Sequence, residues 1–357
     1  MILVVPSSPL GQPELTFRAR KILYAVISEY VATGEPVGSR RIAKRYGINL
    51  SPATIRNVLA DLTDAGVLCQ PHTSSGRIPS ERGFRLFVDG LTQMRDVTTD
   101  DRTAVLERMR ELRPGIDDLV REAGRLLATL AGVAAVVTRP RADTAPLSQI
   151  RFMALKPGEL LAVVIGERGT IQNRVITAPG SLDRSALERL NNYIEANVAG
   201  RTLAELREFF ATEVDTEREL RDRAKQVVEA ATEGDVTTQI VIEGRSVLFD
   251  RPEFTDADKI RQYLRTFDEK ERLVDLLDQT IAAGGVHVLI GSETELDQSS
   301  DISVISANDK LNGVNAGTLG IIGPTRMDYG KLVPLVGFTA QVMSDVLDGE
   351  PPDLDEC

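Results

Sequence analysis

Two adjacent side chains, Arg56 and Asn57, have the chemistry needed to read base edges in double-stranded DNA. The guanidinium of an Arg can bond O6 and N7 of guanine together, and the amide of an Asn can bond N6 and N7 of adenine. Ala53 and Thr54 are small enough to let a helix approach the bases closely. An ordinary solvated helix face is the alternative. Because it would not need Arg and Asn side by side directly after a strong helix-start signal, we favour base reading.

A helix over residues 52–65 must present this pair. Ser51 provides an N-capping hydroxyl, and Pro52 occupies the first helical position, where its missing N–H costs nothing. Apolar residues follow at helical spacing and would face a core, which leaves Arg56 and Asn57 on the solvent side. These core positions are Ile55, Val58, Leu59 and Leu62.

Two further helices are predicted before this one. The first runs over about 17–32, with an apolar stripe facing inward and charged residues, Glu29 among them, on its outer face. The second is short, over 40–46, with Ser39 as its N-cap and Gly47 at its end. Two short helices joined by a tight Gly turn form a helix-turn-helix, which reads bases mainly with the start of its second helix.

A small hairpin follows, with strands near 67–70 and 78–79 joined by a polar turn. Cys69 lies in the first strand, where we expect it to pack in a core. The turn residues suited to contact with phosphates or the minor groove are His72, Thr73, Ser74 and Arg77. Taken singly, each of them is equally an ordinary loop residue, so the hairpin supports a DNA-binding role only together with the helices.

The distribution of charge favours DNA binding by residues 15–100 and not by the rest of the chain. The whole chain carries a net charge of −11, whereas residues 15–100 hold 12 Lys and Arg against 8 Asp and Glu. An acidic remainder repels DNA, so the basic patch determines where DNA docks, although chance clustering would explain the charge alone about as well. The predicted DNA-binding residues are Ser39, Arg40, Ser51, Thr54, Arg56, Asn57, His72, Thr73, Ser74 and Arg77.

Composition argues against several other classes of protein. Cys69 and Cys357 are the only cysteines, so a disulfide framework and a zinc ribbon are both excluded and a reduced cytosol fits best. No segment has the length and apolarity of a membrane span, and residues 1–14 lack the basic start of a secretory signal, so we expect a disordered leader. We find no catalytic motif, and we expect His287 in an apolar strand to be structural. The prediction is no enzyme, no cofactor and no metal.

The rest of the chain predicts an α+β body. A helix over 116–131 precedes a strand-rich segment, a helical segment, and then further strands and helices, which suggests one α+β domain interrupted by another. The turn before the last helix contains Thr325 and Arg326. These residues would either cradle an anion at the helix start or form a tight turn held by an Arg salt bridge, and we favour the turn.

Several motifs closely resemble the HrcA family of bacterial heat-inducible repressors. Near the N-terminus these are TGEPVGS, SPATIRN and QPHTSSGRIP, and near the C-terminus the segment GTLGIIGPTRMDYGKL over residues 317–332. The departures are small: Ser75 stands where the family commonly has Ala, and Phe84 and Phe87 stand where it commonly has Tyr.

The resemblance implies a multidomain α+β fold with an N-terminal winged helix-turn-helix domain and a GAF-like α+β domain that is interrupted by an inserted helical/β dimerisation domain. The expected bounds are a leader over 1–14, the DNA-binding domain over 15–100, the split GAF-like domain over 101–180 and 255–347, the dimerisation domain over 181–254, and an acidic tail over 348–357.

The resemblance also implies a function. We expect repression of class I heat-shock operons, of the groE and dnaK chaperone type, by a homodimer bound to the inverted-repeat CIRCE operator. The expected partners in the cytoplasm are double-stranded DNA, the GroE chaperonin, on which activity would depend, and a second copy of the chain. Two rivals remain open. One is a repressor that senses a small molecule through the GAF-like domain, and the other is an enzyme with a DNA-binding appendage, which the lack of a catalytic constellation disfavours.

Overall fold

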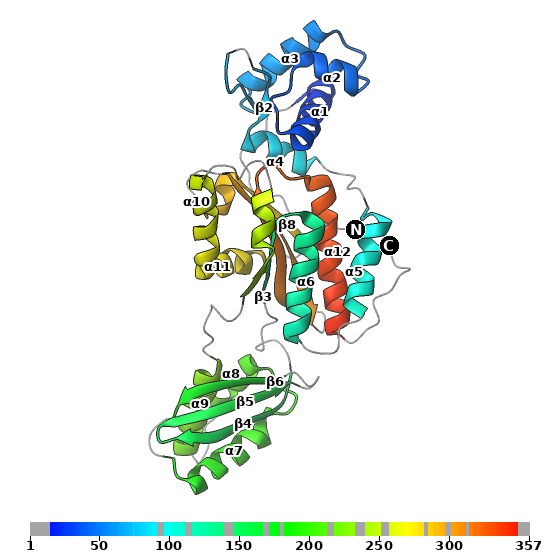
Figure 1. Ribbon diagram of the computed structural model, residues 1–357. Helices are drawn as coiled ribbons and strands as arrows, with labels where there is room; N and C mark the ends of the chain where they lie inside the picture. The colour runs from blue at the N-terminus through cyan, green and yellow to red at the C-terminus, as the bar shows by residue number, and fades with distance from the viewer. Residues whose placement is uncertain are drawn as a thin grey trace.

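The chain forms three lobes arranged end to end in the computed structural model (Figure 1). We call them the head (residues 15–90), the body (96–138 and 240–348) and the insert (146–232). The structure describes residues 15–73, 75–90, 96–110, 116–138, 146–166, 171–178, 182–212, 218–232, 240–250, 257–281, 285–296, 301–311 and 314–348. The predicted leader over 1–14, the predicted contact residue Ser74, and residues 349–357 of the predicted tail lie outside these ranges.

The head combines helices with a two-stranded antiparallel hairpin. Its elements are α1 (Phe17–Thr33), α2 (Ser39–Arg45), α3 (Pro52–Asp64), β1 (Leu68–Cys69), β2 (Ile78–Pro79) and α4 (Glu81–Asp89). Local capping explains two of the helix starts, because Ser51 Oγ accepts from the N–H of Thr54 and Ser80 Oγ from the N–H of Gly83, both over 3.1 Å. The predicted helices and hairpin are therefore present, in the predicted order.

Two local predictions for the head are wrong. Ser39 is not an N-cap, because α2 begins at Ser39 itself, after Gly38, and no side chain caps it. Its side chain is buried rather than exposed. Glu29 is not on the outer face of α1 but fully buried. Glu29 lies seven residues after Ile22, which places both on the same face of the helix, so spacing decides its position and charge does not.

The body is built on a five-stranded antiparallel sheet of order β7-β3-β10-β9-β8. Its strands are β3 (Ala134–Thr138), β7 (Ile240–Glu243), β8 (Val286–Ile290), β9 (Ile302–Leu311) and β10 (Val314–Pro324). Its helices are α5 (Thr99–Arg110), α6 (Ile116–Ala131), η3 (Arg245–Asp250), α10 (Ala257–Asp268), α11 (Lys270–Ile281), η5 (Gly291–Thr294) and α12 (Tyr329–Leu347). Helices α12, α6 and α5 lie on one side of the sheet, and α10 and α11 lie on the other (Figure 1). Head and body share one continuous apolar core.

The insert has a sheet and a core of its own. Strands β4 (Leu147–Lys156), β5 (Glu159–Gly166) and β6 (Ile171–Thr177) form an antiparallel meander. Helices α7 (Arg184–Val198), α8 (Leu203–Thr212) and α9 (Arg218–Thr232) cover one face of that sheet. The apolar side chains between them form a cluster separate from the core of the head and body, so the insert is an independent packing unit.

The predicted boundaries of the interrupted domain are wrong. We expected residues 101–180 to belong to the split domain, but the strands over 147–177 pack on α7 and α9 of the insert. We also expected the insertion to extend to residue 254, but β7 pairs with β3 in the body sheet. Alternating apolar residues identify strands without identifying their partners, so the sequence pattern could not distinguish the two sheets.

Candidate nucleic-acid interface

The start of α3 presents the predicted base-reading pair. Arg56 and Asn57 are both exposed, and among the described residues neither side chain has a hydrogen-bond or ion-pair partner. Ile55 on the opposite face is fully buried and anchors the helix in the core of the head. Ser51 and Thr54 are partly occupied with each other, because their hydroxyl oxygens lie 2.9 Å apart. The pair at Arg56 and Asn57 is thus held out on a rigid helix with its donors available for a ligand.

The tip of the hairpin is ordered by two side chains that the sequence prediction did not include. Gln70 Nε2 donates to the carbonyls of Thr73 and Ser75, over 2.9 and 3.2 Å. Ser75 Oγ donates to the carbonyl of His72 over 2.7 Å and accepts from its N–H over 3.0 Å. His72 and Thr73 remain exposed beside these contacts. An amide at a strand end, followed by a Ser in the turn, is the signal that would have identified this arrangement.

Arg77 is not at the free tip. Its Nε donates to Thr63 Oγ1 of α3 over 2.8 Å, and its N–H and carbonyl pair with the carbonyl and N–H of Val37, over 2.9 and 2.8 Å. The neighbouring Gly76 has no room for a Cβ, which would lie 2.5 Å from the carbonyl carbon of Val37. Arg77 therefore fastens the hairpin to α3 and to the segment before α2. Cys69, expected to be buried, is exposed.

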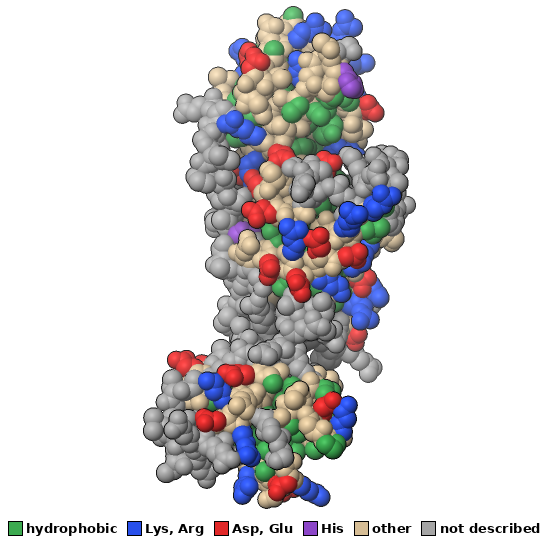
Figure 2. Space-filling model, turned by 90° about the vertical axis from the view of Figure 1, so that its left-hand side faces the viewer, with side chains coloured by type: hydrophobic (Ala, Val, Ile, Leu, Met, Phe, Trp, Pro, Cys, Tyr) green, Lys and Arg blue, Asp and Glu red, His purple; other side chains and the backbone are tan. Residues whose placement is uncertain are grey.

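Helix α2 is basic along its exposed side. Arg40 and Lys44 are exposed, and neither has a partner among the described residues. The side chains of Arg41 and Arg45 reach inward to the buried carboxylate of Glu29, over 2.6 and 2.9 Å. Lys and Arg side chains gather at the outer end of the head, away from the body (Figure 2). The head thus carries a cationic surface beside the exposed face of α3.

Thr325 and Arg326, the predicted anion cradle or turn, lie where the body meets the head. The N–H of Thr325 donates to the carbonyl of Asp301 over 2.9 Å, and its carbonyl accepts from the hydroxyl of Tyr329 over 2.8 Å. Arg326 Nη1 donates to the carbonyl of Val31 in α1 over 2.7 Å. Arg326 therefore joins the body to the head, a role that neither expectation included.

A second set of contacts joins α4 to the body. Arg85 Nη1 donates to the carbonyl of Val288 over 2.7 Å and lies 3.0 Å from Glu293 Oε2. Glu81 Oε2 accepts from the hydroxyl and the N–H of Ser292, over 2.7 and 3.2 Å. These polar contacts hold the head against η5 and the end of β8.

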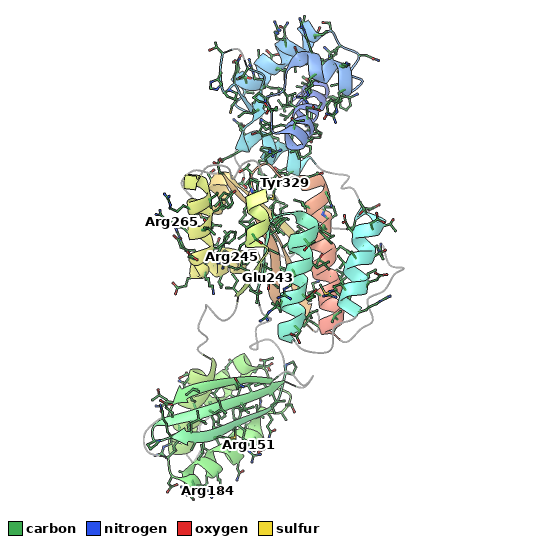
Figure 3. The ribbon with its side chains drawn as sticks, viewed as in Figure 1. Arg151, Arg184, Glu243, Arg245, Arg265 and Tyr329 are labelled. Atoms are coloured by element: carbon green, nitrogen blue, oxygen red, sulfur yellow. The ribbon has the colours of Figure 1, made fainter. Side chains whose placement is uncertain are left out.

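An aromatic contact completes this boundary. The ring centroids of Phe84 in α4 and Tyr329 at the start of α12 lie 5.8 Å apart, and Figure 3 shows Tyr329 directly below the head. The Tyr329 hydroxyl is 3.0 Å from Ser303 Oγ, and complete burial raises its pKa well above the usual value. We call this boundary, formed by Arg326, Arg85, Glu81 and Phe84 with their partners, the head–body seam.

Comparison with known proteins identifies the family. Residues 117–333 match the family model described as the HrcA protein C-terminal domain. The heat-inducible transcription repressor HrcA of Sorangium cellulosum is 46% identical over 341 residues, covering 93% of this chain and 98% of that protein. The same repressor of Geobacter sulfurreducens is 38% identical, covering 94% of this chain and 99% of that protein. The chain belongs to the HrcA family.

A solved structure supports the architecture of this HrcA chain. A crystal structure described only as that of a hypothetical protein aligns with a TM-score of 0.60 at 21% sequence identity. The alignment covers 95% of this chain and 99% of that one. At this identity the likeness shows the fold alone, a mixed helix and sheet protein of several lobes.

The two segments of this HrcA chain that carried the resemblance meet at the head–body seam. Val31 lies two residues before the TGEPVGS motif, which begins at Thr33, and Arg326 lies within the segment over 317–332. They are in hydrogen-bond contact although 295 residues separate them.

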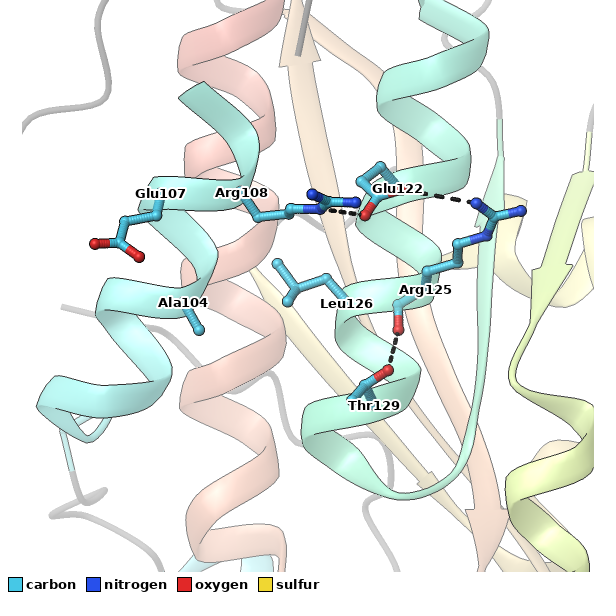
Figure 4. A pocket seen from close by; sticks show the side chains of 7 residues that line it. All are labelled: Ala104, Glu107, Arg108, Glu122, Arg125, Leu126 and Thr129. Carbon is cyan, nitrogen blue, oxygen red and sulfur yellow. Dashed lines mark hydrogen bonds and ion pairs between the residues drawn. The ribbon is translucent and has the colours of Figure 1, made fainter. Parts of the chain in front are cut away.

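The body of this HrcA chain also has a surface hollow of about 300 Å³ between α5 and α6 (Figure 4). Two arginines in its lining form ion pairs with Glu122: Arg108 Nε lies 2.5 Å from Glu122 Oε1, and Arg125 Nη1 lies 3.8 Å from Glu122 Oε2. In the part of the chain that the structure describes, no three His, Cys, Asp or Glu side chains are placed to hold a metal ion. None of the helices described there has the length and apolarity to cross a membrane.

Proposed function

We propose that this chain represses chaperone heat-shock operons of the groE and dnaK type by binding the inverted-repeat CIRCE operator as a homodimer. The observation that carries the proposal is the exposed pair Arg56 and Asn57 at the start of α3, whose side chains have no partner among the described residues. Their donors match the major-groove edges of guanine and adenine. The family relationship supports the heat-shock role, because the curated relatives are named heat-inducible transcription repressors.

The head in this proposal is a winged helix-turn-helix domain. Helices α2 and α3 form the helix-turn-helix, and the β1–β2 hairpin forms the wing. The hydrogen bond from Arg77 to Thr63 supports this assignment, because it holds the hairpin beside the reading helix as a wing requires. His72 and Thr73 at the exposed tip would then contact phosphates or the minor groove. Ser74, which lies outside the described residues, would do the same. Ser51 and Thr54, whose hydroxyls also contact each other, would bind the DNA backbone near the start of α3. Arg40 would bind the DNA backbone from α2. Ser39, which is buried, is a poor candidate.

The insert in this proposal carries the dimer contact. Large apolar side chains are exposed on the face of its sheet that the helices leave open: Met153 at 47%, Leu155 at 53% and Val175 at 55%. Leu161 pairs with both Met153 and Val175 in register, so these side chains form one continuous apolar patch. An exposed apolar patch of this kind is typical of an interaction surface. A second copy of the same face would cover it, as the two-fold symmetry of an inverted-repeat operator requires.

The body in this proposal is the GAF-like domain, and activity depends on the GroE chaperonin in the cytoplasm. The alternative from the sequence, a repressor that senses a small molecule through this domain, gains no support from the hollow between α5 and α6. That hollow is an open surface feature whose Arg108, Arg125 and Glu122 side chains pair with one another.

The proposed function is tested by footprinting the full chain on chaperone promoters of its own organism. We expect protection of an inverted repeat, with both half-sites protected at the same protein concentration. Equal protection of promoter and random DNA would contradict the proposal. Binding that appears only after a small molecule is added or removed would favour the ligand-sensing alternative.

A further inference from the structure

Glu29 is a buried carboxylate that has no role in the proposed function as described above. It lies in α1 with 0% of its side chain exposed. Removing a carboxylate from water costs several kcal/mol unless cationic and hydrogen-bonding partners compensate it. A buried carboxylate therefore needs well-defined partners, and the residues that serve as partners indicate what Glu29 does in the head.

Every described partner of the Glu29 carboxylate comes from α2 or from Tyr46, the residue directly after it. Glu29 Oε1 lies 2.6 Å from Arg41 Nε and 2.9 Å from Arg45 Nη1, and Oε2 accepts from the Tyr46 hydroxyl over 3.1 Å. Helix α2 has seven residues and no side-chain N-cap, so as an isolated helix it would be only marginally stable. The Glu29 cluster therefore fixes both the position of α2 and the orientation of its two arginines.

The two arginines are only partly used by Glu29. Their side chains remain 46% and 58% exposed, and neither has another partner among the described residues. A guanidinium has five N–H donors in a planar fork, so each arginine keeps donors that point away from Glu29. One carboxylate also neutralises only one of the two positive charges. Arg41 and Arg45 thus form an oriented, net positive pair on the surface of the head.

The position of this pair indicates its ligand. Arg41 and Arg45 are four residues apart and lie on one face of α2. The exposed Arg40 and Lys44 add positive charge to the same helix. In a helix-turn-helix the first helix crosses the phosphate backbone while the second enters the major groove. Arginine is suited to this contact because its fork can bind two phosphate oxygens at once.

We propose that Glu29 holds Arg41 and Arg45 as a preorganised phosphate-binding pair that sets the register of the head on the DNA backbone. Glu29 is a positioning residue that acts through the two arginines, which contact the DNA. The inference rests on the proposed function, because it requires the head to bind duplex DNA with α3 in the groove.

The test measures binding of the full chain to an operator duplex and to a random duplex of equal length, over a range of salt concentrations. The double variant R41A/R45A should weaken binding to both duplexes. The slope of log K against log salt should become shallower by about 0.9 for each lost phosphate contact, roughly 3 to 4 for two arginines in each of two heads. The variant R272A removes an equally exposed, Glu-paired arginine from α11 and should leave affinity and slope unchanged.

The variant E29Q separates positioning from charge. It makes the head more positive by one charge, so electrostatics alone would strengthen DNA binding. If Glu29 positions the arginines, E29Q should instead weaken operator binding by about 2- to 10-fold. The reason is that Arg41 and Arg45, once released from Glu29, must lose conformational entropy when they bind DNA. Urea denaturation must show that E29Q and R41A/R45A remain folded, and R41K/R45K, which keeps the charge but loses the fork, should be intermediate.

Two results would overturn the inference. One is an unchanged salt slope for folded R41A/R45A, which would show that the arginines only neutralise Glu29. The other is operator binding by folded E29Q that equals or exceeds that of the unmodified chain. If R56A still loses operator preference in the same assay, the proposed function stands and only this inference fails. An unmodified chain without operator preference would refute the proposed function itself.

Discussion

The guanidinium of Arg326 donates to the carbonyl of Val31 over 2.7 Å and so caps the end of α1 from the body. The last carbonyls of a helix have no partner within the helix, and a cation near them is also favoured by the helix dipole. Gly34, which follows α1 with a φ of +73°, lies against the same guanidinium. The orientation of the head is therefore linked to the turn before α12, the last helix of the body.

Loss of this link should destabilise the whole chain. We expect Arg326→Ala to lower the free energy of unfolding by about 1 to 3 kcal/mol, because it leaves a part-buried carbonyl without its charged donor. Urea denaturation followed by circular dichroism measures the change. Arg265→Ala, at an exposed position of α10 with no described partner, is the matched control and should have little effect. Equal stability of the two variants would contradict the assigned role.

If α3 reads bases, variants of Arg56 and Asn57 should lose specificity for the operator. Replacing Arg56 or Asn57 by Ala should cost about 1 to 3 kcal/mol at the specific operator and less on random DNA. The buried Ile55 should keep the helix folded in both variants. Fluorescence anisotropy with both duplexes measures the difference, and Asp64→Asn at the far end of α3 is the control. Equal losses on both duplexes would show that these residues contact phosphates.

The apolar face of the insert predicts the mode of assembly. Val175→Asp should place a charge in the proposed interface and shift the chain from dimer to monomer in sedimentation velocity. Arg184→Glu, on the helical side of the insert and 94% exposed, is a larger charge change that should nevertheless leave the dimer intact. The monomeric variant should also bind the operator weakly, because the two heads are no longer linked. A stable Val175→Asp dimer would place the interface elsewhere.

The buried carboxyl of Asp309 in β9 predicts a pH dependence of stability. Burial raises its pKa to about 7, against the opposing effect of the nearby N–H groups of Gly317 and of Asp309 itself. The folded chain therefore holds this proton more tightly than the unfolded chain. The free energy of unfolding should fall as the pH rises from about 4 to about 7, by at most about 4 kcal/mol, and this contribution should be constant above that range.

Asp309→Asn tests the assignment. It removes the carboxylate with little change in shape, so it should stabilise the chain at pH 8 and flatten the decline between pH 5 and 7. Asp268→Asn, exposed at the end of α10, should leave the profile unchanged. A parallel decline in Asp309→Asn and the unmodified chain would assign the pH dependence to other groups.

The topology of the body predicts how heat changes activity. Strand β3 pairs with β10, with Val137 opposite Leu319, so the sheet must close over a long stretch of chain. Such non-local pairing folds slowly and exposes apolar edges on the way. After a heat pulse, functional chaperonin should therefore raise the number of active repressors at a constant Kd, as measured by titration of operator binding. A changed Kd with a constant number of active sites would indicate an allosteric co-repressor instead.

The local structure was largely predictable from the sequence, whereas the long-range partners were not. The sequence predicts a helix over residues 116–131, and α6 has these bounds, because apolar residues recur along it at helical spacing. The contact of Arg77 Nε with Thr63 was not predictable, because a loop arginine in a sequence carries no sign of a partner fourteen residues away. DNA contact by Arg77 remains a prediction. Glu29 was misplaced because its charge was weighted above its spacing, although the spacing was the better guide.

The insert leaves and re-enters the body at neighbouring points. Thr138 and Ile240 are opposite each other in the antiparallel pair of β3 and β7, so for the body sheet the insert occupies the place of a hairpin loop. The cost of closing a loop rises only by about 0.6 kcal/mol for each doubling of its length. A sheet of this kind tolerates gaining a whole folded unit in one genetic event. The two lobes are then free to diverge at separate evolutionary rates, since neither contributes a strand to the other.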